Sequence, residues 1–344
     1  MTESTDPRRW GRRLSDAIRL ALEAGDRAQA RRLALEGDGQ AQSLAREYAL
    51  MYRGLGVTIR ILLPLLAAIA RRAGAAAEVE DLLRAFRADL LALMERAYGE
   101  DGAQPARAVS GADEAERTAR LLEAGEALFS REQARLAAEA VAAIEAGDAG
   151  RARALLDRKE RQQYVPLHDR LVRFMAESFG WALRRGGPAE LLWLHRETAA
   201  GQRQGFAKWD ALPAAEFARQ TTFLLKQHMG AAEVEEDAER FTIRQHPCGS
   251  GGRLRLGGAY DGEGALPFVE GPGPLTFGEA RLPVYCSHCP IWNGMMPIEW
   301  FGRPHWVFET PARADGSCTL HVYKRRDGAP REYGARVGAQ AGRR

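Results

Sequence analysis

Four cysteines carry the strongest chemical signal in the sequence, because all of them fall in its last third. They are Cys248, Cys286, Cys289 and Cys318, and no histidine of the chain precedes position 168. Two close pairs stand out, His246 with Cys248 and Cys286 with Cys289. Zinc takes about four thiolate or imidazole ligands in a tetrahedron, and two close pairs supply them readily. The spacing therefore predicts one Zn²⁺ bound by His246, Cys248, Cys286 and Cys289.

The fourth ligand is the open point of this prediction, because His288 and Cys318 compete with His246. His288 lies inside the CSHC turn, where a side chain more often points outward. Cys318 alternates with Leu320 and Val322, as a core thiol would in a strand. Packed thiols without a metal are the plain alternative to zinc. Redox use of the CxxC pair is disfavoured, since no βαβ pattern surrounds it.

The hexapeptide HPCGSG at 246–251 resembles the opening of the SEC-C motif, a small zinc-binding module that begins Cys-Pro-Cys-Gly-Ser-Gly. In this resemblance His246 takes the place of the motif's first cysteine ligand, and Cys248 matches the second. The motif closes its site within a few residues through Cys-Cys or Cys-His, whereas this chain continues with GRLRLGGAYD. The resemblance covers six residues and implies zinc binding only.

A second group of candidate residues lies in helical sequence before the cysteines. An imidazole beside a carboxylate can move protons, because the acid holds the ring in one tautomer. We therefore expect His168, Asp169 and His195 to be catalytic and to face one cavity, with Trp292 or Trp300 on its opposite wall. The alternative is that each histidine is a buried, hydrogen-bonded residue of an amphipathic helix.

The elements that position these residues are predicted by two patterns, of which the first is a repeat of helical stretches. AIRLALEAGDRAQARRLAL at 17–35 and AVAAIEAGDAGRARALLDR at 140–158 share a helix, an E-A-G-D break and a second helix. In each break Gly suits a helix stop and Asp suits an N-cap. The repeat predicts an internal duplication, with helical copies at 1–110 and 111–232 joined by a linker at 99–116.

Beyond the second copy the pattern changes to short alternating stretches separated by Gly and Pro. EVEEDAERFTIRQ at 233–245 predicts a hairpin, PIEWFGRPHWVFET at 297–310 predicts strand, turn and strand, and CTLHVYK at 318–324 predicts a further strand. A loop-rich module of this size gains much stability from a bound metal. The sequence therefore predicts an α+β protein, in which a duplicated all-α region precedes a zinc-stapled β module at 233–325 and a disordered basic tail at 326–344.

Charge and hydropathy exclude several partners. The net charge is +3, and residues 324–344 hold seven basic and two acidic residues, a balance of +5. The rest of the chain is close to neutral, so no nucleic-acid partner is expected. The most apolar run, ILLPLLAAIA at 61–70, is half as long as a membrane span and predicts a buried helix. No signal peptide is evident, and the expected location is the cytoplasm, where clustered thiols favour metal binding or catalysis over disulfides.

Two functions remain open at this point. In the first, an unknown small molecule binds between the second helical copy and the zinc module and undergoes hydrolase- or lyase-type chemistry. In the second, the zinc is purely structural and the chain is a non-enzymatic binding or regulatory protein with a protein partner. Three protein ligands plus water favour a catalytic zinc, and four favour a structural one. Because three side chains compete for the fourth position, the sequence favours structural zinc. No phosphate loop, dinucleotide fingerprint, G-x-S-x-G or H-E-x-x-H motif occurs.

Overall fold

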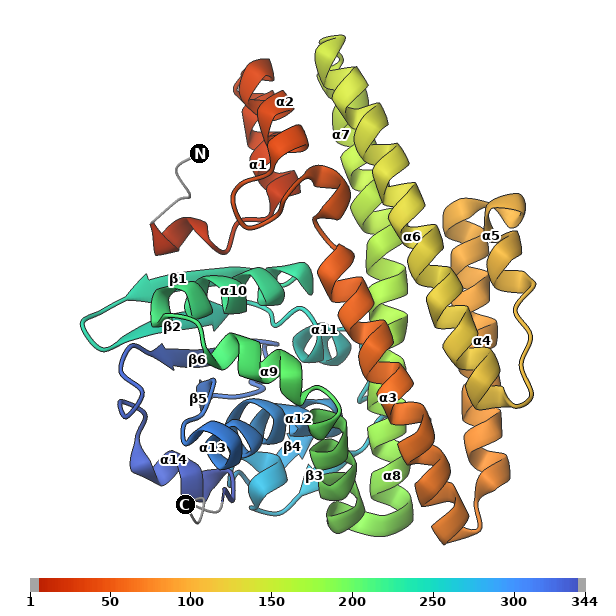
Figure 1. Ribbon diagram of the computed structural model, residues 1–344, viewed down its shortest axis with the longest axis vertical. Helices are drawn as coiled ribbons and strands as arrows, with labels where there is room; N and C mark the ends of the chain where they lie inside the picture. Colours follow the sequence, from red (N-terminus) through yellow and green to blue (C-terminus); the bar gives the residue numbers. More distant parts are fainter. Residues whose placement is uncertain (1–5, 340–344) are drawn as a thin grey trace. The chain divides into compact units, whose positions relative to one another are not determined.

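The structure is a computed structural model that describes residues 6–339 (Figure 1). Contacts divide the chain into two units. The first contains Asp6 and residues 12–64 and 75–172, and the second contains residues 7–11, 65–74 and 173–339. Helices dominate, and the second unit also carries a four-stranded antiparallel sheet, so the predicted α+β class is confirmed.

The first unit is helical throughout its described elements. Its helices are α1 (Leu14–Glu23), α2 (Arg27–Glu36), η2 (Leu44–Arg46), α4 (Ala76–Tyr98), α5 (Glu100–Arg107), α6 (Glu114–Glu145), α7 (Ala149–Asp157), the π-helical turn η3 (Arg158–Tyr164) and the first parts of α3 (Ala49–Ala73) and α8 (Val165–Ala200). Buried residues of α4 recur every three or four positions, so one stripe of this helix faces the core. They are Val79, Leu83, Phe86, Leu90 and Met94.

The two Gly-Asp breaks have the same local geometry. Gly25 and Gly147 have φ angles of 74° and 78°, a region that glycine adopts without strain. Asp26 caps α2 and Asp148 caps α7, each accepting a hydrogen bond from the backbone N–H three residues further on, at 2.9 and 2.8 Å. The predicted helix stops and N-caps are confirmed. A duplication of the whole helical region stays a prediction.

The predicted linker at 99–116 is partly helical, because α5 occupies Glu100–Arg107. Ala103 and Ala106 are buried on one face of α5, which packs against α4 and α6. Small apolar residues at positions three apart therefore give this Gly- and Pro-containing segment a buried helical face. The expectation of a linker is wrong for these residues.

The apolar run at 61–70 lies in α3, as predicted. The segment Leu44–Ala73 is long and apolar enough to cross a membrane by length and composition, and half of its most apolar window is buried. Core helices of soluble proteins pass the same test, so this helix does not place the protein in or out of a membrane.

The second unit combines helices with two small sheets. Its elements are η1 (Pro7–Arg9), α9 (Arg203–Asp210), α10 (Ala214–Gln227), β1 (Ala232–Glu236), β2 (Arg240–Gln245), α11 (Gly251–Leu256), β3 (Phe268–Glu270), η4 (Pro274–Thr276), β4 (Arg281–Pro283), η5 (Val284–Ser287), α12 (His288–Pro290), the π-helical turn η6 (Ile291–Met295), α13 (Met296–Phe301), β5 (Val307–Thr310), β6 (Cys318–Tyr323), α14 (Arg331–Arg336) and the later parts of α3 and α8. Within α8, Gly187 has a φ of 70° and breaks the helix before Pro188.

The larger sheet has the strand order β1-β2-β6-β5, with every pair antiparallel. Phe241 pairs with Val322 and Ile243 with Leu320, and all four side chains are buried. Helix α10 contacts β1, β2 and β6 and covers this sheet (Figure 1). The predicted hairpin at 233–245 and the strand at 318–324 are confirmed.

The stretch 297–310 differs from its prediction. Its first half forms helix α13, and β5 supplies the strand of the second half. Pro297 stands in the first turn of α13, where its missing N–H costs nothing, and Gly302 ends the helix with a φ of 78°. The expectation of a strand before the Gly-Arg-Pro turn is wrong for this reason.

The predicted disordered tail is ordered over its described part, 326–339. Tyr333 of α14 is 3% exposed, and its hydroxyl accepts a hydrogen bond from Phe308 N at 3.3 Å. Arg336 donates to two backbone carbonyls, including that of Phe308 at 2.7 Å. Burial of the tyrosine and these charge-assisted bonds hold the segment, so the expectation is wrong there. Residues 340–344 lie outside the described part.

Candidate functional site

The fold brings the four cysteines of the chain to one region of the second unit. Cys318 begins β6 and pairs with Gln245 at the end of β2. Cys248 follows three residues after Gln245, and its N–H donates to Gly316 O at 2.9 Å. The register of two central strands therefore sets Cys248 beside the start of β6, although the two cysteines are far apart in the sequence.

Cys286 and Cys289 enter from η5 and α12, which follow β4. A Cβ atom at Gly251 would lie 2.8 Å from Cys286 Sγ, and one at Gly252 would lie 3.2 Å from Cys248 Cβ. Helix α11 can therefore begin against both cysteines only because these two positions carry no side chain. We refer to Cys248, Cys286, Cys289 and Cys318 as the thiol cluster.

The pKa values of Cys286, Cys289 and Cys318 are raised by burial and by neighbouring thiols. Burial raises the pKa of Cys286 to about 12, and the charge of Cys248 contributes to the increase. Burial also raises the pKa of Cys289 and of Cys318, and both values respond to Cys286 and Cys248. The pKa of Cys289 responds to Cys318 as well. Cys286, Cys289 and Cys318 therefore keep their protons at neutral pH unless a cation stabilises the thiolates.

Arg255 of α11 places a positive charge beside the thiol cluster. Its Nη1 donates a hydrogen bond to Cys286 Sγ at 3.3 Å, and its charge opposes the rise in the pKa values of Cys286, Cys289 and Cys318. Its Nε and Nη2 atoms are buried and have no hydrogen-bond partner among residues 6–339. Such donors can offset the negative charge that several thiolates accumulate around a metal.

The donor set of the thiol cluster suits a soft metal ion. Four thiolates form a common shell for structural zinc, and iron–sulfur clusters also use four. Over the described part of the chain, no three His, Cys, Asp or Glu side chains stand in an arrangement that could hold a metal ion. The four cysteines therefore fit zinc by the chemistry of their donor atoms but not by their present spacing, and a complete zinc shell requires the sulfur atoms to approach one another.

The three candidates for the fourth ligand lie in different surroundings. His246 is exposed. His288 donates from Nδ1 to Tyr285 O at 2.5 Å, and its Nε2 lies 3.6 Å from Cys289 Sγ. Cys318 is 7% exposed and is electrostatically coupled to the other three cysteines. Among these candidates, Cys318 is the one enclosed with the other thiols.

His195 of α8 contacts the CSHC turn directly. Its Nε2 lies 2.8 Å from the Oγ atom of Ser287, a residue that stands between Cys286 and Cys289 in the sequence. Trp292 Nε1 donates to the backbone carbonyl of His195 at 3.0 Å, and the two rings meet edge to face with centroids 6.1 Å apart. Burial lowers the pKa of His195 far below its usual value, so the ring is neutral. Trp292 does not form the opposite wall of a cavity from His195, because the two side chains pack against each other; a wall formed by Trp300 stays a prediction.

His168 and Asp169 belong to the first unit. His168 is fully buried, and its Nδ1 lies 2.8 Å from Asp169 Oδ1. The carboxylate holds the proton on Nδ1, as expected for an acid that fixes a tautomer. The ring also lies beside Tyr164, with centroids 5.5 Å apart. Joint action of this pair with His195, which belongs to the second unit, stays a prediction.

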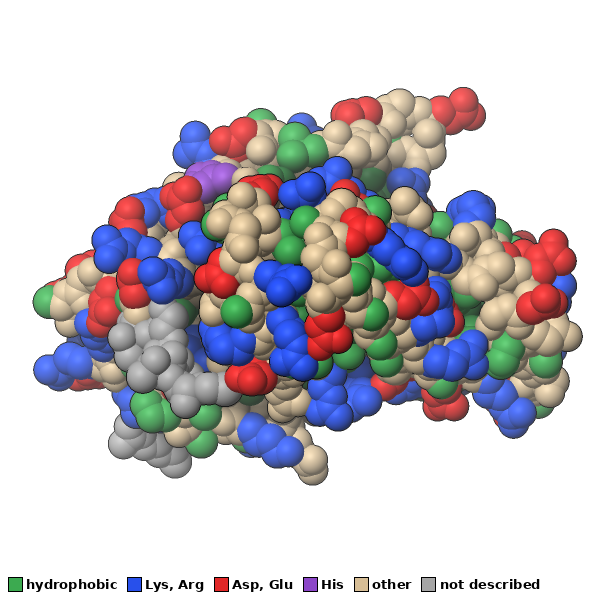
Figure 2. Space-filling model, turned by 90° about the horizontal axis from the view of Figure 1, so that it is seen from above, with side chains coloured by type: hydrophobic (Ala, Val, Ile, Leu, Met, Phe, Trp, Pro, Cys, Tyr) green, Lys and Arg blue, Asp and Glu red, His purple; other side chains and the backbone are tan. Residues whose placement is uncertain are grey.

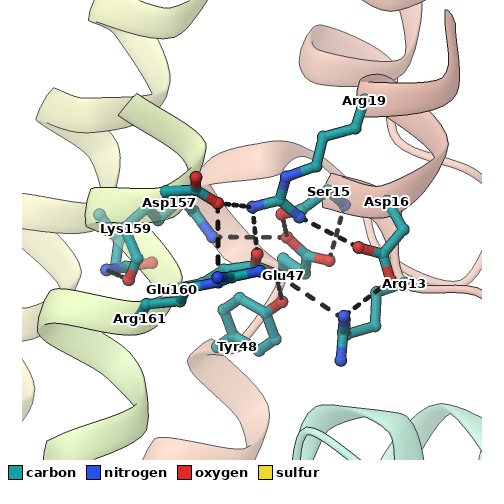
Figure 3. Close-up of polar contacts among 11 residues, drawn as sticks. Arg13, Ser15, Asp16, Arg19, Glu47, Tyr48, Asp157, Lys159, Glu160 and Arg161 are labelled. Atoms are coloured by element: carbon teal, nitrogen blue, oxygen red, sulfur yellow. Dashed lines mark hydrogen bonds and ion pairs between the residues drawn. The ribbon is translucent and has the colours of Figure 1, made fainter. Parts of the chain in front are cut away.

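The first unit contains a buried group of charged residues that the sequence analysis missed (Figure 3). We refer to Glu47, Tyr48, Lys159 and Glu160 as the buried charge network, since each is at most 2% exposed. Lys159 Nζ lies 3.5 Å from Glu47 Oε2, and the Tyr48 hydroxyl donates to Glu160 Oε1. Ser15 of α1 donates its backbone N–H to Glu47 Oε1 at 2.9 Å and its hydroxyl to Oε2.

The charges of this network compensate one another. Burial raises the pKa of Glu47 and lowers that of Lys159. Burial also acts to raise the pKa of Glu160, but Arg19 and the Tyr48 hydroxyl outweigh it, and the net shift is downward. Arg19 Nη2 donates to Glu160 Oε2 at 2.5 Å (Figure 3). Glu160 is therefore ionised and held by an arginine from another helix.

Lys159 and Glu160 are adjacent in the π-helical turn η3, and both point into the core. A π-helical turn inserts an extra residue into a helix and changes which positions face inward. An amphipathic pattern does not predict such a turn. The composition alone sets Lys159 apart, because it is one of only four lysines in a chain with 45 arginines.

Neither the surface charge nor comparison with known proteins indicates a function for the thiol cluster or the buried charge network. Basic and acidic side chains are intermingled over the face shown in Figure 2. No protein-family model, no curated protein and no solved structure matches the chain.

Proposed function

We propose that the second unit is a zinc-binding module in which one Zn²⁺ is held by Cys248, Cys286, Cys289 and Cys318. The observation that carries this proposal is geometric: the register of β2 with β6 and the close approach of α11 to Cys248 and Cys286 gather thiols that arrive from separate segments. The pKa values of Cys286, Cys289 and Cys318 respond to neighbouring thiols, in agreement with this placement. Burial raises the pKa values of Cys286, Cys289 and Cys318, so these thiols cost free energy to ionise, and a divalent cation supplies the charge that makes ionisation favourable.

Cys318 takes the fourth position in this proposal, where the spacing alone favoured His246. Cys318 is buried and coupled to the other thiols, whereas His246 is exposed. As the thiols lose their protons, they can close around the metal to the spacing that zinc requires. Arg255 then donates to the Cys286 thiolate.

Four protein ligands leave no position for a catalytic water, so the zinc is structural. The metal would join the β2–β6 end of the sheet, the start of α11 and the turn after β4. Long irregular connections separate these segments, and a cross-link among them removes much of the conformational freedom of the unfolded chain. This proposal makes the binding or regulatory function the leading one for the protein as a whole.

Metal analysis tests the proposal. Protein purified without added metal should contain about one zinc per chain, as four cysteine ligands specify. A chelator that removes the zinc should lower the melting temperature, and a thiol-blocking reagent applied to the metal-free protein should prevent reloading. Metal-free protein with unchanged stability would contradict the proposal, and so would iron with visible absorption.

An acid–base function of His168 and Asp169 is the second candidate. The observation in its favour is the 2.8 Å contact between the Asp169 carboxylate and His168 Nδ1, which fixes the tautomer of the ring. Hydrolase- or lyase-type chemistry on a small molecule would use this imidazole. Replacement of His168 separates this role from a purely structural one and is treated below.

A further inference from the structure

We propose that His195 is a positioning residue for the zinc site, holding the CSHC turn in the conformation in which Cys286 and Cys289 can both bind the metal. This inference rests on the proposed zinc site. It adds a residue that lies in a different helix and outside the ligand set, and that acts through one hydrogen bond to Ser287.

The direction of that hydrogen bond follows from the donors available. Ser287 has one hydroxyl proton, and it donates this proton to Val284 O at 2.6 Å. A carbonyl oxygen can only accept, so the Ser287 oxygen must accept at its contact with His195. His195 therefore carries its proton on Nε2, and a continuous chain runs from His195 Nε2–H through the Ser287 hydroxyl to Val284 O.

In this tautomer the other ring nitrogen, Nδ1, is left without a hydrogen bond to any described residue. This costs free energy, which the contact with Ser287 must offset. His195 is fully buried, and its Nδ1 has no hydrogen-bond partner within residues 6–339. Phe179 meets the ring edge to face with centroids 4.5 Å apart, and Trp292 anchors the backbone carbonyl. These contacts hold the ring in place. A buried ring nitrogen without a partner costs free energy, and we assign to the other nitrogen of His195 the task that accounts for this cost.

The task is to fix the turn between two ligands. Ser287 directly follows Cys286 and lies two residues before Cys289, and its side chain is fully buried. Its hydroxyl bonds to Val284 O within η5, and its contact with His195 ties this end of η5 to α8. Partners outside the ligand set typically change metal affinity 10–100-fold when removed, because they orient the ligands.

Two substitutions of His195 test this role. The amide nitrogen of glutamine is the same number of bonds from Cα as His195 Nε2, so His195→Gln can still donate to Ser287. The side chain of His195→Asn is one bond shorter and cannot reach it. Leu194→Ala is the matched control, since Leu194 is also fully buried in α8 but has no polar group to offer the turn.

The measurement is the rate of zinc release to a chromogenic chelator, at a temperature at which circular dichroism shows every variant folded. His195→Asn should release zinc about 10–100-fold faster than the unsubstituted protein, and His195→Gln should restore slow release. Leu194→Ala should lower the melting temperature with little change in the release rate. Ser287→Ala removes the acceptor and should release zinc as fast as His195→Asn. This second variant allows the test to be made if His195→Asn does not fold.

The outcomes separate this inference from the proposed function. If the unsubstituted protein holds no zinc, the proposed function fails. If it holds zinc, and His195→Asn and Ser287→Ala release zinc as slowly as the unsubstituted protein, the positioning role is wrong and the zinc site stands. Equal acceleration by His195→Gln, His195→Asn and Leu194→Ala would show that His195 contributes only to general stability.

Discussion

Arg255 Nη1 donates a hydrogen bond to Cys286 Sγ at 3.3 Å, and this contact places a guanidinium group beside four thiols. Four thiolates around Zn²⁺ carry a net charge of about −2. A buried cation that donates to one of the sulfurs reduces the cost of that charge. Arg255 is therefore expected to contribute to metal affinity without being a ligand.

Arg255→Leu should weaken zinc binding roughly tenfold, because it removes the cation and the hydrogen bond to the Cys286 thiolate. Competition with a chelator of known affinity measures the change. Arg253→Leu, in the same short helix, is the matched control and should have a smaller effect. Equal affinities for Arg255→Leu and the unsubstituted protein would show that the contact has no role in metal binding.

The buried charge network gives a prediction for the first unit. Lys159→Met leaves Glu47 without its cation in the core, and breaking a buried ion pair in this way costs about 3–5 kcal/mol of unfolding free energy. Denaturant unfolding measures the loss, with the exposed Lys208→Met as control. The double variant Lys159→Met with Glu47→Gln should recover part of the loss, because the unpaired charge is gone. A loss below about 1 kcal/mol for Lys159→Met would contradict the importance of the network.

His168→Ala distinguishes the structural role of this residue from the catalytic one. His168 is fully buried and contacts Asp169, so its removal should lower the unfolding free energy by about 2 kcal/mol through the lost packing of the ring and the lost hydrogen bond. Zinc content should not change. An unchanged melting temperature would favour a catalytic role of His168 and Asp169 instead.

His305 makes the stability of the second unit sensitive to mild acid. It stacks on Phe301 and lies 3.5 Å from Asp210, but burial lowers its pKa from 6.5 to about 4. Asp210 acts to raise this pKa, and Arg303 and Arg326 act to lower it. Between pH 6.5 and 4 the unfolded chain binds a proton that the folded chain excludes, so stability is lost as the pH falls through this range.

His305→Gln removes the titrating group and should reduce the loss of unfolding free energy between pH 7 and about pH 4.5 by about 2 kcal/mol. Denaturant unfolding at the two pH values measures the difference. Since the other groups still titrate, some loss remains. The same pH dependence in both proteins would show that His305 does not exclude its proton in the folded state.

Periodic patterns predicted the local structure well. The Gly-Asp breaks at Gly25 and Gly147, the hairpin of β1 and β2 and the strand β6 follow from helical spacing, capping and alternation, which are local properties. The helix α13 and the ordered end of the chain were missed. Both depend on tertiary contacts, such as the burial of Tyr333 against residues far away in the sequence.

For the candidate site, the sequence indicated which residues could bind a metal better than it indicated which residues would lie next to one another. Cysteine spacing singled out the segments in which the thiols lie, and the alternation around Cys318 predicted a thiol in a strand, where the structure places it, 7% exposed. Only the register of β2 with β6 places it near Cys248. The contact of His195 with Ser287 joins two segments whose proximity no local pattern encodes.

The charge network was not predictable from periodicity. Lys159 and Glu160 are adjacent, charged and helical, a combination that normally lies on a solvated surface. They are buried because η3 is a π-helical turn and because Glu47 and Arg19 arrive from distant helices.

The central claim is that four cysteines, and not His246, form the metal shell, and Co²⁺ substitution tests it most directly. The sulfur-to-cobalt charge-transfer absorption scales with the number of bound thiolates, so a four-cysteine site should lose about a quarter of it in Cys318→Ser. His246→Ala should keep the full absorption and the unsubstituted metal affinity. The reverse result, with Cys318→Ser unchanged and His246→Ala weakened in binding, would contradict the four-thiolate site and restore the ligand set that the spacing predicted.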